Sequence, residues 1–208
     1  MQEENSYQVL NLGVGEAGGV MQMDSVDKAL VDTQVATAKQ FGRDMTRSIN
    51  NMLFMATRKP ETAQKMGYYL PRGGKAITGP SVHLAKIVAS CWGNLRTEAK
   101  VVNIDRVNKV IVSRGTCWDL ESNVISAFEV RRSIATKNGI MTDDMITVVG
   151  NAANSIAYRN AVFAVVPRDI TDEVYNAALR AITGDLNDEE KLNNRRLQCL
   201  KFFNDEYG

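Results

Sequence analysis

The chain has 208 residues, of which 44% are hydrophobic and 24% charged, a composition typical of an ordinary soluble domain with a substantial core. No stretch approaches the roughly 18 uncharged apolar residues of a membrane-spanning helix, and the acidic N-terminus lacks the features of a signal peptide. Three widely separated cysteines and one histidine argue against a zinc site and fit reduced thiols in a cytosol.

The charges are unevenly distributed along the chain. Residues 1–71 carry 7 Lys/Arg and 8 Asp/Glu, residues 72–168 carry 13 and 7, and residues 169–208 carry 5 and 9. The middle segment therefore has a net charge of +6 between two acidic flanks. This pattern favours one polyanion-binding face, and an unevenly charged, merely solvated surface is the alternative.

Residues 1–24 are polar and glycine-rich, and we expect a flexible N-terminal arm. Gly13, Gly15 and Gly18 have the spacing of the dinucleotide-binding fingerprint. That fingerprint requires a helix that opens within it and a complete βαβ unit, whereas the next helical pattern begins only near Ser25. A small nucleotide-binding enzyme is therefore the less favoured interpretation.

From Ser25 to Thr57 apolar residues recur at helical spacing, and Gly42 is a candidate break between two helices. Pro60 is expected to interrupt the helical pattern. Glu61–Met66 should form one or two further helical turns that end at Gly67. The several methionines here are typical of an adaptable core or of subunit packing.

The segment from Tyr68 to Asn94 predicts a short extended piece, a glycine-rich basic loop and a helix. Pro80 suits the first helical position, and Gly93 suits a left-handed residue after the last turn. Arg72 and Lys75 flank two glycines in the loop, and we expect this loop beside the helix N-terminus to form an anion site. One helix face is expected to be apolar: Val82, Ala85, Val88, Ala89 and Trp92.

Three extended runs follow, Leu95–Asp105, Val107–Trp118 and Val124–Ala135, with turn-rich breaks between them. Their alternating pattern predicts a three-stranded antiparallel meander with one face on a core and the other face in solvent. The third run leads into a cationic stretch with Arg131, Arg132 and Lys137.

A long helix is predicted from the N-cap Thr142 to Pro167, with Arg159 facing the same groove as the basic loop. A third helix should span Thr171–Thr183, and a final one Asp188 to about Phe203. The long helix is slim because it contains Gly150, Ala152, Ala153, Ala157 and Ala161. Its expected buried stripe is Met145, Val148, Val149, Ala152, Ile156, Phe163 and Val166.

The predicted fold class is therefore α+β, a three-stranded antiparallel β-meander packed against helices with N-terminal and C-terminal helical segments. After the arm, residues 25–208 form a single domain. Within it, residues 25–66 are helical, 68–168 are the basic core, and 169–208 are a helical, acidic end.

The sequence offers little for catalysis. Cys91 and His83 are eight residues apart on one helix, about 12 Å along its axis, which is too far for proton exchange. Lys75 is followed by Ala76 and not by the Ser or Thr of a phosphate-binding P-loop. We expect no enzyme and no cofactor or metal.

Nucleic-acid binding fits the sequence better, because phosphate contacts need several cations on one surface. The aromatic side chains Tyr68, Tyr69, Trp118 and Phe128 are either core residues or candidates for stacking on single-stranded bases. The candidate DNA-binding cations are Arg72, Lys75, Lys86, Arg131, Arg132, Lys137 and Arg159.

Two motifs carry a resemblance to a known family. They are the run PRGGKAITGPS at residues 71–81, which leads into a helix ending in CWGN at 91–94, and the turn WDLESN at 118–123. Both resemble segments of phage single-strand DNA annealing proteins, the RecT, Redβ and Erf-like recombinases. The resemblance covers roughly residues 60–208.

This resemblance implies a single-stranded DNA-binding and annealing protein that acts in ATP-independent homologous recombination in the cytosol of a bacterial host. It implies a homo-oligomeric ring or filament, and a phage exonuclease or a host single-strand-binding protein as further partners. Arg72 and Lys75 would grip phosphate from the loop, while Arg131, Arg132 and Lys137 line a strand edge. The rival interpretation is a phage structural or oligomeric scaffold protein without a role on DNA.

Overall fold

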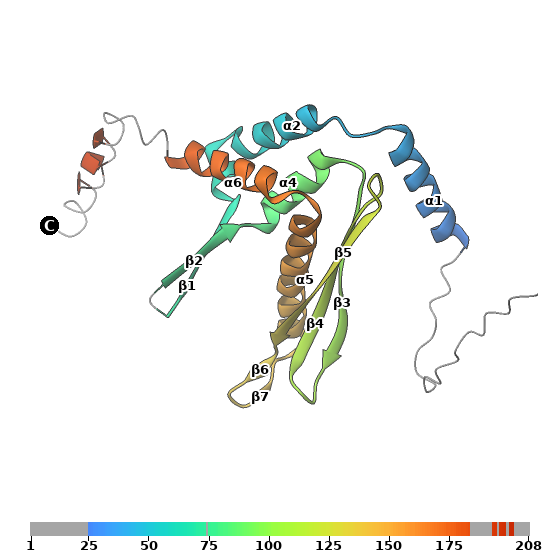
Figure 1. Cartoon of the computed structure of the whole chain (residues 1–208). Helices are drawn as coiled ribbons and strands as arrows, with labels where there is room; N and C mark the ends of the chain where they lie inside the picture. The colour runs from blue at the N-terminus through green and yellow to red at the C-terminus, as the bar shows by residue number, and fades with distance from the viewer. Residues whose placement is uncertain (1–24, 74, 184–192, 195, 199, 202–208) are drawn as a thin grey trace, which may run out of the picture.

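The computed structural model describes residues 25–73, 75–183, 193–194, 196–198 and 200–201. Its fold is α+β, with a three-stranded antiparallel sheet packed against helices (Figure 1). The expected N-terminal arm and most of the expected final helix lie outside the described residues.

The N-terminal helical run is divided as expected. Helix α1 spans Ser25–Gln40 and α2 spans Met45–Thr57, so the break falls around Gly42. Helix α2 begins after Asp44, whose side chain accepts a hydrogen bond from the Arg47 N–H at 2.9 Å and satisfies a donor that the helix leaves free. The short helix α3, Pro60–Gln64, starts at a proline, where no N–H is needed.

A β-hairpin replaces the predicted loop beside a helix. Strand β1, Gly67–Arg72, pairs with β2, Lys75–Pro80, and the register runs from Gly67 opposite Pro80 to Arg72 opposite Lys75. Because only two residues separate the strands, the basic loop is the hairpin's tight turn. The tip lies five strand residues, or about 16 Å, from the start of the next helix. The predicted pairing of this loop with a helix N-terminus is therefore wrong.

Helix α4 spans Val82–Trp92, and the prediction that Pro80 opens it is also wrong. Pro80 ends β2, and Ser81 caps the helix, its Oγ accepting from the N–H groups of His83 and Leu84 at 3.1 and 3.3 Å. A serine N-cap satisfies two donors, which outweighs the preference of proline for the first helical position. The predicted glycine end is confirmed, since Gly93 has a φ of +75°.

The predicted meander is confirmed. Strands β3 (Leu95–Asp105), β4 (Val110–Asp119) and β5 (Val124–Ser133) form an antiparallel sheet in the order β3-β4-β5. The second strand begins three residues later than expected because residues 106–109 form the turn, which the Asp105 carboxylate stabilises by accepting from the Asn108 N–H at 2.8 Å. A small hairpin, β6 (Ala135–Thr136) and β7 (Gly139–Ile140), follows.

Helix α5, Asp143–Val165, lies against one face of this sheet. At the contact, a Cβ added to Gly115 would be 2.2 Å from the Ala157 carbonyl oxygen, so the two backbones touch. The helix therefore turns its small residues and Ile146 to the sheet. The predicted stripe is wrong at Met145 and Val148, which are 48% and 57% exposed, because large side chains would hold the backbones apart.

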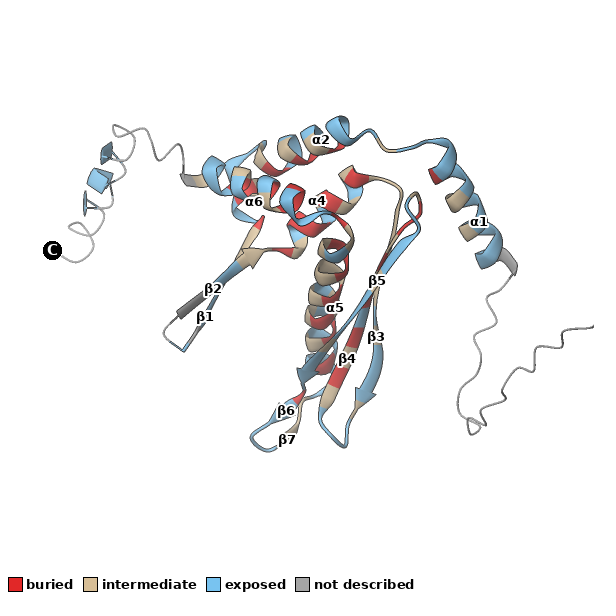
Figure 2. Ribbon diagram, viewed as in Figure 1, coloured by how far each residue is buried: buried red, intermediate tan, exposed pale blue. Residues whose placement is uncertain are grey.

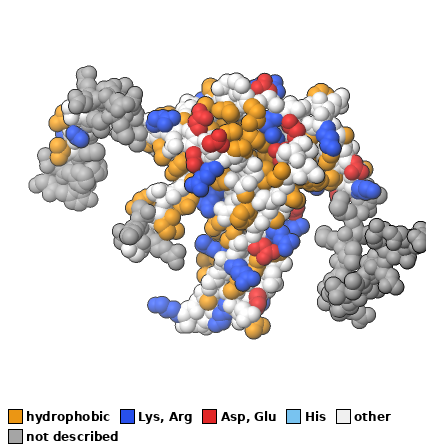
Figure 3. Space-filling view, viewed as in Figure 1, with side chains coloured by type: hydrophobic (Ala, Val, Ile, Leu, Met, Phe, Trp, Pro, Cys, Tyr) orange, Lys and Arg blue, Asp and Glu red, His pale blue; other side chains and the backbone are white. Residues whose placement is uncertain are grey.

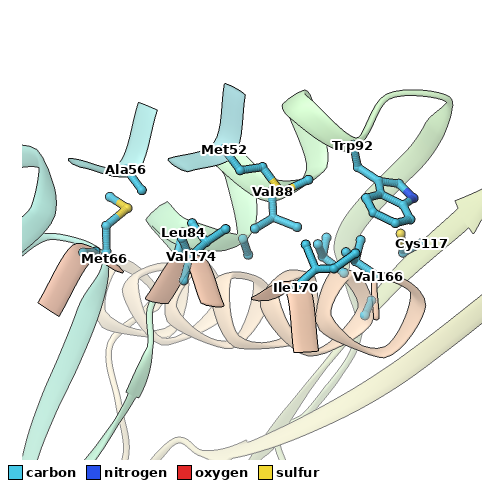
Figure 4. Close-up of a cluster of buried hydrophobic side chains, with 14 of the residues drawn as sticks. Met52, Ala56, Met66, Leu84, Val88, Trp92, Cys117, Val166, Ile170 and Val174 are labelled. Atoms are coloured by element: carbon cyan, nitrogen blue, oxygen red, sulfur yellow. The ribbon is translucent and has the colours of Figure 1, made fainter. Parts of the chain in front are cut away.

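The larger core lies where α2, α4, α6 (Arg168–Thr183) and the C-terminal part of α5 meet (Figure 4). Trp92 is buried there, as predicted, beside Cys117 of β4. A smaller core of Ile111, Ile134 and Ile146 joins α5 to the distal end of the sheet. Figure 2 shows the buried residues of the two cores in red, whereas most of the β1–β2 hairpin is coloured as exposed.

Candidate nucleic-acid interface

The β1–β2 hairpin projects from the body and leaves a hollow between itself and α5 (Figures 1 and 3). Hydrophobic side chains lie along the hairpin, and Lys and Arg side chains lie on the body side of the hollow (Figure 3). Tyr69, Leu70 and Ile77 are 70%, 51% and 41% exposed. An arm that exposes this much apolar surface is typical of a binding element.

A pocket of about 400 Å³ lies at the closed end of the hollow, where the hairpin base, the start of α4 and the middle of α5 meet. This volume is within the range of small-ligand sites, about 300–1,000 Å³. We call it the basic pocket, and its lining residues are Lys65, Gly67, Tyr68, Ser81, Val82, His83, Ser155, Ile156 and Arg159.

Arg159 and Tyr68 form the centre of the basic pocket. The Arg159 Cζ lies 4.8 Å from the centroid of the Tyr68 ring, a cation–π contact. The Arg159 guanidinium also donates to Asn160 Oδ1, from Nε at 3.3 Å and from Nη2 at 3.2 Å. Because these contacts leave guanidinium donors over, Arg159 is oriented by protein and still able to bind an anion.

Among the described residues that line the basic pocket, the side chains that can carry a charge near neutral pH are all basic. Lys65 and His83 also line the basic pocket, and no carboxylate is among its described lining residues. The positive end of the α4 dipole points the same way, because Ser81, the N-cap, is part of the wall. A phosphate group is the anion that such a set of donors fits best.

The structure distributes the seven predicted cations over several places. Arg159 lies in the basic pocket, and the exposed Lys86 follows His83 by one turn of α4. Arg72 and Lys75 are opposite each other in the backbone register at the hairpin tip. Lys137 lies between β6 and β7.

Arg131 and Arg132 follow each other on β5 and therefore point to opposite faces of the sheet. Arg132 is opposite the buried Ile111, on the face that α5 covers, and Arg131 is opposite Val112. Both arginines line a shallow hollow of about 350 Å³ that also contains Asp105. Hydrogen bonds from the backbone and then the side chain of Asn108 lower the pKa of Asp105, so this carboxylate stays charged and offsets part of the positive charge of the two arginines.

Sequence reasoning missed Lys65 and His83 as pocket residues. Lys65 follows α3, and His83 was noted only as a poor partner for Cys91. Nothing in their local sequence marks them, because only the antiparallel return of β2 brings residue 81 next to residue 65: the Ser81 N–H donates to the Met66 carbonyl oxygen at 2.7 Å.

Of the motifs that carried the family resemblance, the PRGGKAITGPS run forms the tip and second strand of the hairpin and ends at the basic pocket, whereas the WGN and WDLESN segments meet at a different place, around Arg43. Its Nη2 lies 2.9 Å from Asp119 Oδ2 and its Nε donates to the Trp92 carbonyl oxygen at 2.8 Å. Glu121 Oε2 accepts from the Arg43 N–H and from Asn94 Nδ2, each at 3.0 Å. The WGN and WDLESN residues therefore hold the fold together, on the far end of α4 from the basic pocket.

The described residues hold no group of three or more His, Cys, Asp or Glu side chains arranged to bind a metal. Burial raises the pKa of the Cys91 thiol, and burial with the nearby Asp119 charge raises the pKa of Cys117 to about 12. Both thiols are thus protonated and weakly nucleophilic at neutral pH. In the part of the chain that the structure describes, no helix has both the length and the apolar character to cross a membrane.

Comparison of this chain with protein-family models, with curated proteins and with solved structures finds no match.

Proposed function

We propose that this protein binds single-stranded DNA and anneals complementary strands without ATP, as a homo-oligomeric ring or filament in the cytosol of a bacterial host. The observation that carries the proposal is the stacking of Arg159 on Tyr68 in a pocket that also holds Lys65 and His83 and has no carboxylate among its described lining.

Single-strand binding requires cations that follow the phosphate backbone and aromatic faces on which bases stack. The basic pocket has a cation and an aromatic ring at one point, since Arg159 lies over the Tyr68 ring; its guanidinium would bind a phosphate, and the ring would contact a base. The hollow between the hairpin and α5 gives the strand a path that continues past this point (Figure 3). Annealing makes and breaks no covalent bond, so it requires binding sites and no catalytic group.

The test is the affinity of Arg159→Ala for a fluorescently labelled single-stranded oligonucleotide, measured by anisotropy. Loss of a charge-assisted phosphate contact, about 1.5–3 kcal/mol, weakens binding by roughly 10- to 150-fold. The matched control is Arg168→Ala, which removes an 88% exposed arginine on α6 and should leave affinity unchanged.

A strand-pairing assay completes the test. Complementary oligonucleotides should pair faster with the protein than without it, in the absence of ATP, and Arg159→Ala should abolish the gain. The scaffold alternative predicts that the protein assembles equally with and without DNA and leaves pairing rates unchanged. That result would refute the proposed function.

A further inference from the structure

Strand β2 has a glycine directly opposite the aromatic residue of the basic pocket. Gly79 pairs with Tyr68 across the hairpin, so the two positions share one face of it. The described glycines with a positive φ are Gly73, Gly93 and Gly139, and Gly79 is not among them. Its backbone conformation is therefore open to any residue, and only the space around it calls for glycine.

The Tyr68 ring fills the space beside Gly79. A Cβ added to Gly79 would lie 2.9 Å from the Tyr68 hydroxyl oxygen, 3.0 Å from its Cε1 and 3.1 Å from its Cζ. These separations are shorter than the roughly 3.5–4.0 Å at which carbon atoms pack. The phenol end of Tyr68 thus lies across β2 at Gly79, and any side chain at this position would displace it.

Two further elements pack around the same ring. Arg159 of α5 lies over it, with its Cζ 4.8 Å from the ring centroid. Tyr175 of α6 lies against the hairpin base, since a Cβ added to Gly67 would be 3.3 Å from the Tyr175 hydroxyl oxygen. Burial and then the nearby Tyr68 raise the pKa of Tyr175. The Tyr68 ring therefore lies where β2, α5 and α6 meet, and β2 makes room for it by lacking a side chain.

We infer that Gly79 is a positioning residue of the basic pocket, because the space it leaves on β2 lets the Tyr68 ring lie against the Arg159 guanidinium. The consequence for DNA affinity rests on the proposed function, whereas the arrangement of ring and guanidinium can be measured without DNA. Gly79 acts through Tyr68 and contacts no nucleic acid itself. This gives a role to one glycine of the PRGGKAITGPS run.

The test compares Gly79→Ala and Gly79→Val, with circular dichroism to verify folding. Both should fold, because rotation of the Tyr68 side chain can move the phenol away and valine suits a strand. Affinity for a fluorescently labelled single-stranded oligonucleotide should fall from glycine to alanine to valine. Gly79→Val should lose as much as Tyr68→Ala, roughly 5- to 150-fold, the loss for one base-stacking aromatic.

Thr78→Val is the matched control. Thr78 is the exposed neighbour of Gly79 on β2, and its side chain points to the other face of the hairpin. The same residue type is thereby introduced one position away from the ring, and affinity should not change.

A double variant separates positioning from a general effect on the hairpin. Adding Gly79→Val to Tyr68→Ala should cause no further loss of affinity, because the ring that valine displaces is already absent. If the two substitutions acted independently, their effects would add.

The readout without DNA is the NMR resonance of the Arg159 Nε–H group, which the ring current of Tyr68 shifts in the unsubstituted protein. Tyr68→Ala removes that shift, and Gly79→Val should reduce it in the same direction. Gly79→Ala should have a smaller effect, and Thr78→Val should leave the resonance in place.

Three results would overturn the inference. They are binding by Gly79→Val as tight as that of Thr78→Val, a further loss of affinity when Gly79→Val is added to Tyr68→Ala, and an Arg159 resonance that Gly79→Val does not move. Absence of oligonucleotide binding by the unsubstituted protein would instead refute the proposed function. The Arg159 resonance would then still decide whether Gly79 positions the ring.

Discussion

Arg43 and Asp119 form a buried ion pair at 2.9 Å, with side chains only 9% and 5% exposed. Arg43 comes from the linker between α1 and α2, while Asp119 ends β4. The guanidinium also lies 4.3 Å from the centre of the Trp92 ring, and Trp92 Nε1 donates to Asp119 Oδ2 at 3.2 Å. One arginine thereby fixes the N-terminal linker to the end of α4 and to the β4–β5 turn.

The first prediction is that Arg43→Ala strongly destabilises the fold. It leaves the Asp119 carboxylate buried without its partner, which costs about 3–5 kcal/mol, and Arg43→Lys should cost less because it keeps the charge and loses the forked geometry. Urea unfolding followed by circular dichroism measures both. The control Arg47→Ala removes an exposed arginine of α2, and an equal loss there would contradict the role given to the pair.

The second prediction concerns the pH dependence of stability. Burial raises the pKa of Asp119, but hydrogen bonds from the Ser122 N–H, Trp92 and the Glu121 N–H, with the charge of Arg43, outweigh it and hold the pKa below 3.8. A carboxyl group whose pKa is lower in the folded state stabilises the fold fully above its unfolded value, and that contribution is lost as the pH falls through the folded value.

The free energy of unfolding should therefore fall as the pH drops below about 4, and Asp119→Asn should flatten this dependence by lowering stability at neutral pH. Urea titrations at several pH values between 7 and 3 provide the measurement. Asp105→Asn, which alters an exposed turn, should have a smaller effect. Parallel curves for Asp119→Asn and the unsubstituted protein would show that another group controls the acid response.

The third prediction is that Gly115→Ala prevents α5 from seating on the sheet. The added methyl would lie 2.2 Å from the Ala157 carbonyl oxygen and 2.7 Å from the Tyr158 N, and neither backbone atom can move without shifting the helix. We expect a loss of about 3 kcal/mol or more, at the upper end for overpacking, visible as a lower urea midpoint. Gly42→Ala is the matched control because its Cβ would meet only Glu121 Oε1, at 3.5 Å.

The sequence predicted those features that local chemistry decides. Strict alternation predicted the three strands of the meander, and the glycines predicted the helix boundaries around Gly42 and Gly93. Trp92 was correctly placed in the core. The predicted α5 stripe was wrong at Met145 and Val148 because the pattern is apolar on two sides of the helix. Which of the two sides faces the sheet depends on how closely Gly115 lets the sheet approach α5. That is a tertiary contact, which the helical pattern alone does not contain.

The candidate site was only partly predictable. Arg159 was singled out as a mid-helix cation, yet its neighbours Lys65 and His83 come from segments whose proximity depends on the return of β2. The basic loop was recognised, but it was wrongly placed beside the N-terminus of α4. Because Arg72 and Lys75 are separated by only two residues and are opposite each other in the register, the loop is the tip of a hairpin. Likewise, Arg43 has no local signal, since its partners lie 49 to 78 residues further along the chain.

The last prediction separates the two contributions of the basic pocket to DNA affinity. Tyr68→Ala removes the stacking face and should weaken binding of single-stranded oligonucleotide by about 1–3 kcal/mol, with little change in the slope of log K against log salt. Arg159→Ala should instead reduce the magnitude of that slope by about 0.7, the value for one phosphate contact on a single strand. Tyr68→Phe keeps the ring and should bind normally, while Phe54→Ala is the control, since Phe54 is a 61% exposed aromatic residue of α2 outside the hairpin and the basic pocket. Anisotropy titrations from low to high salt distinguish the variants. If Tyr68→Ala binds as tightly as Phe54→Ala, the ring of Tyr68 makes no contribution to affinity, and the bases stack elsewhere.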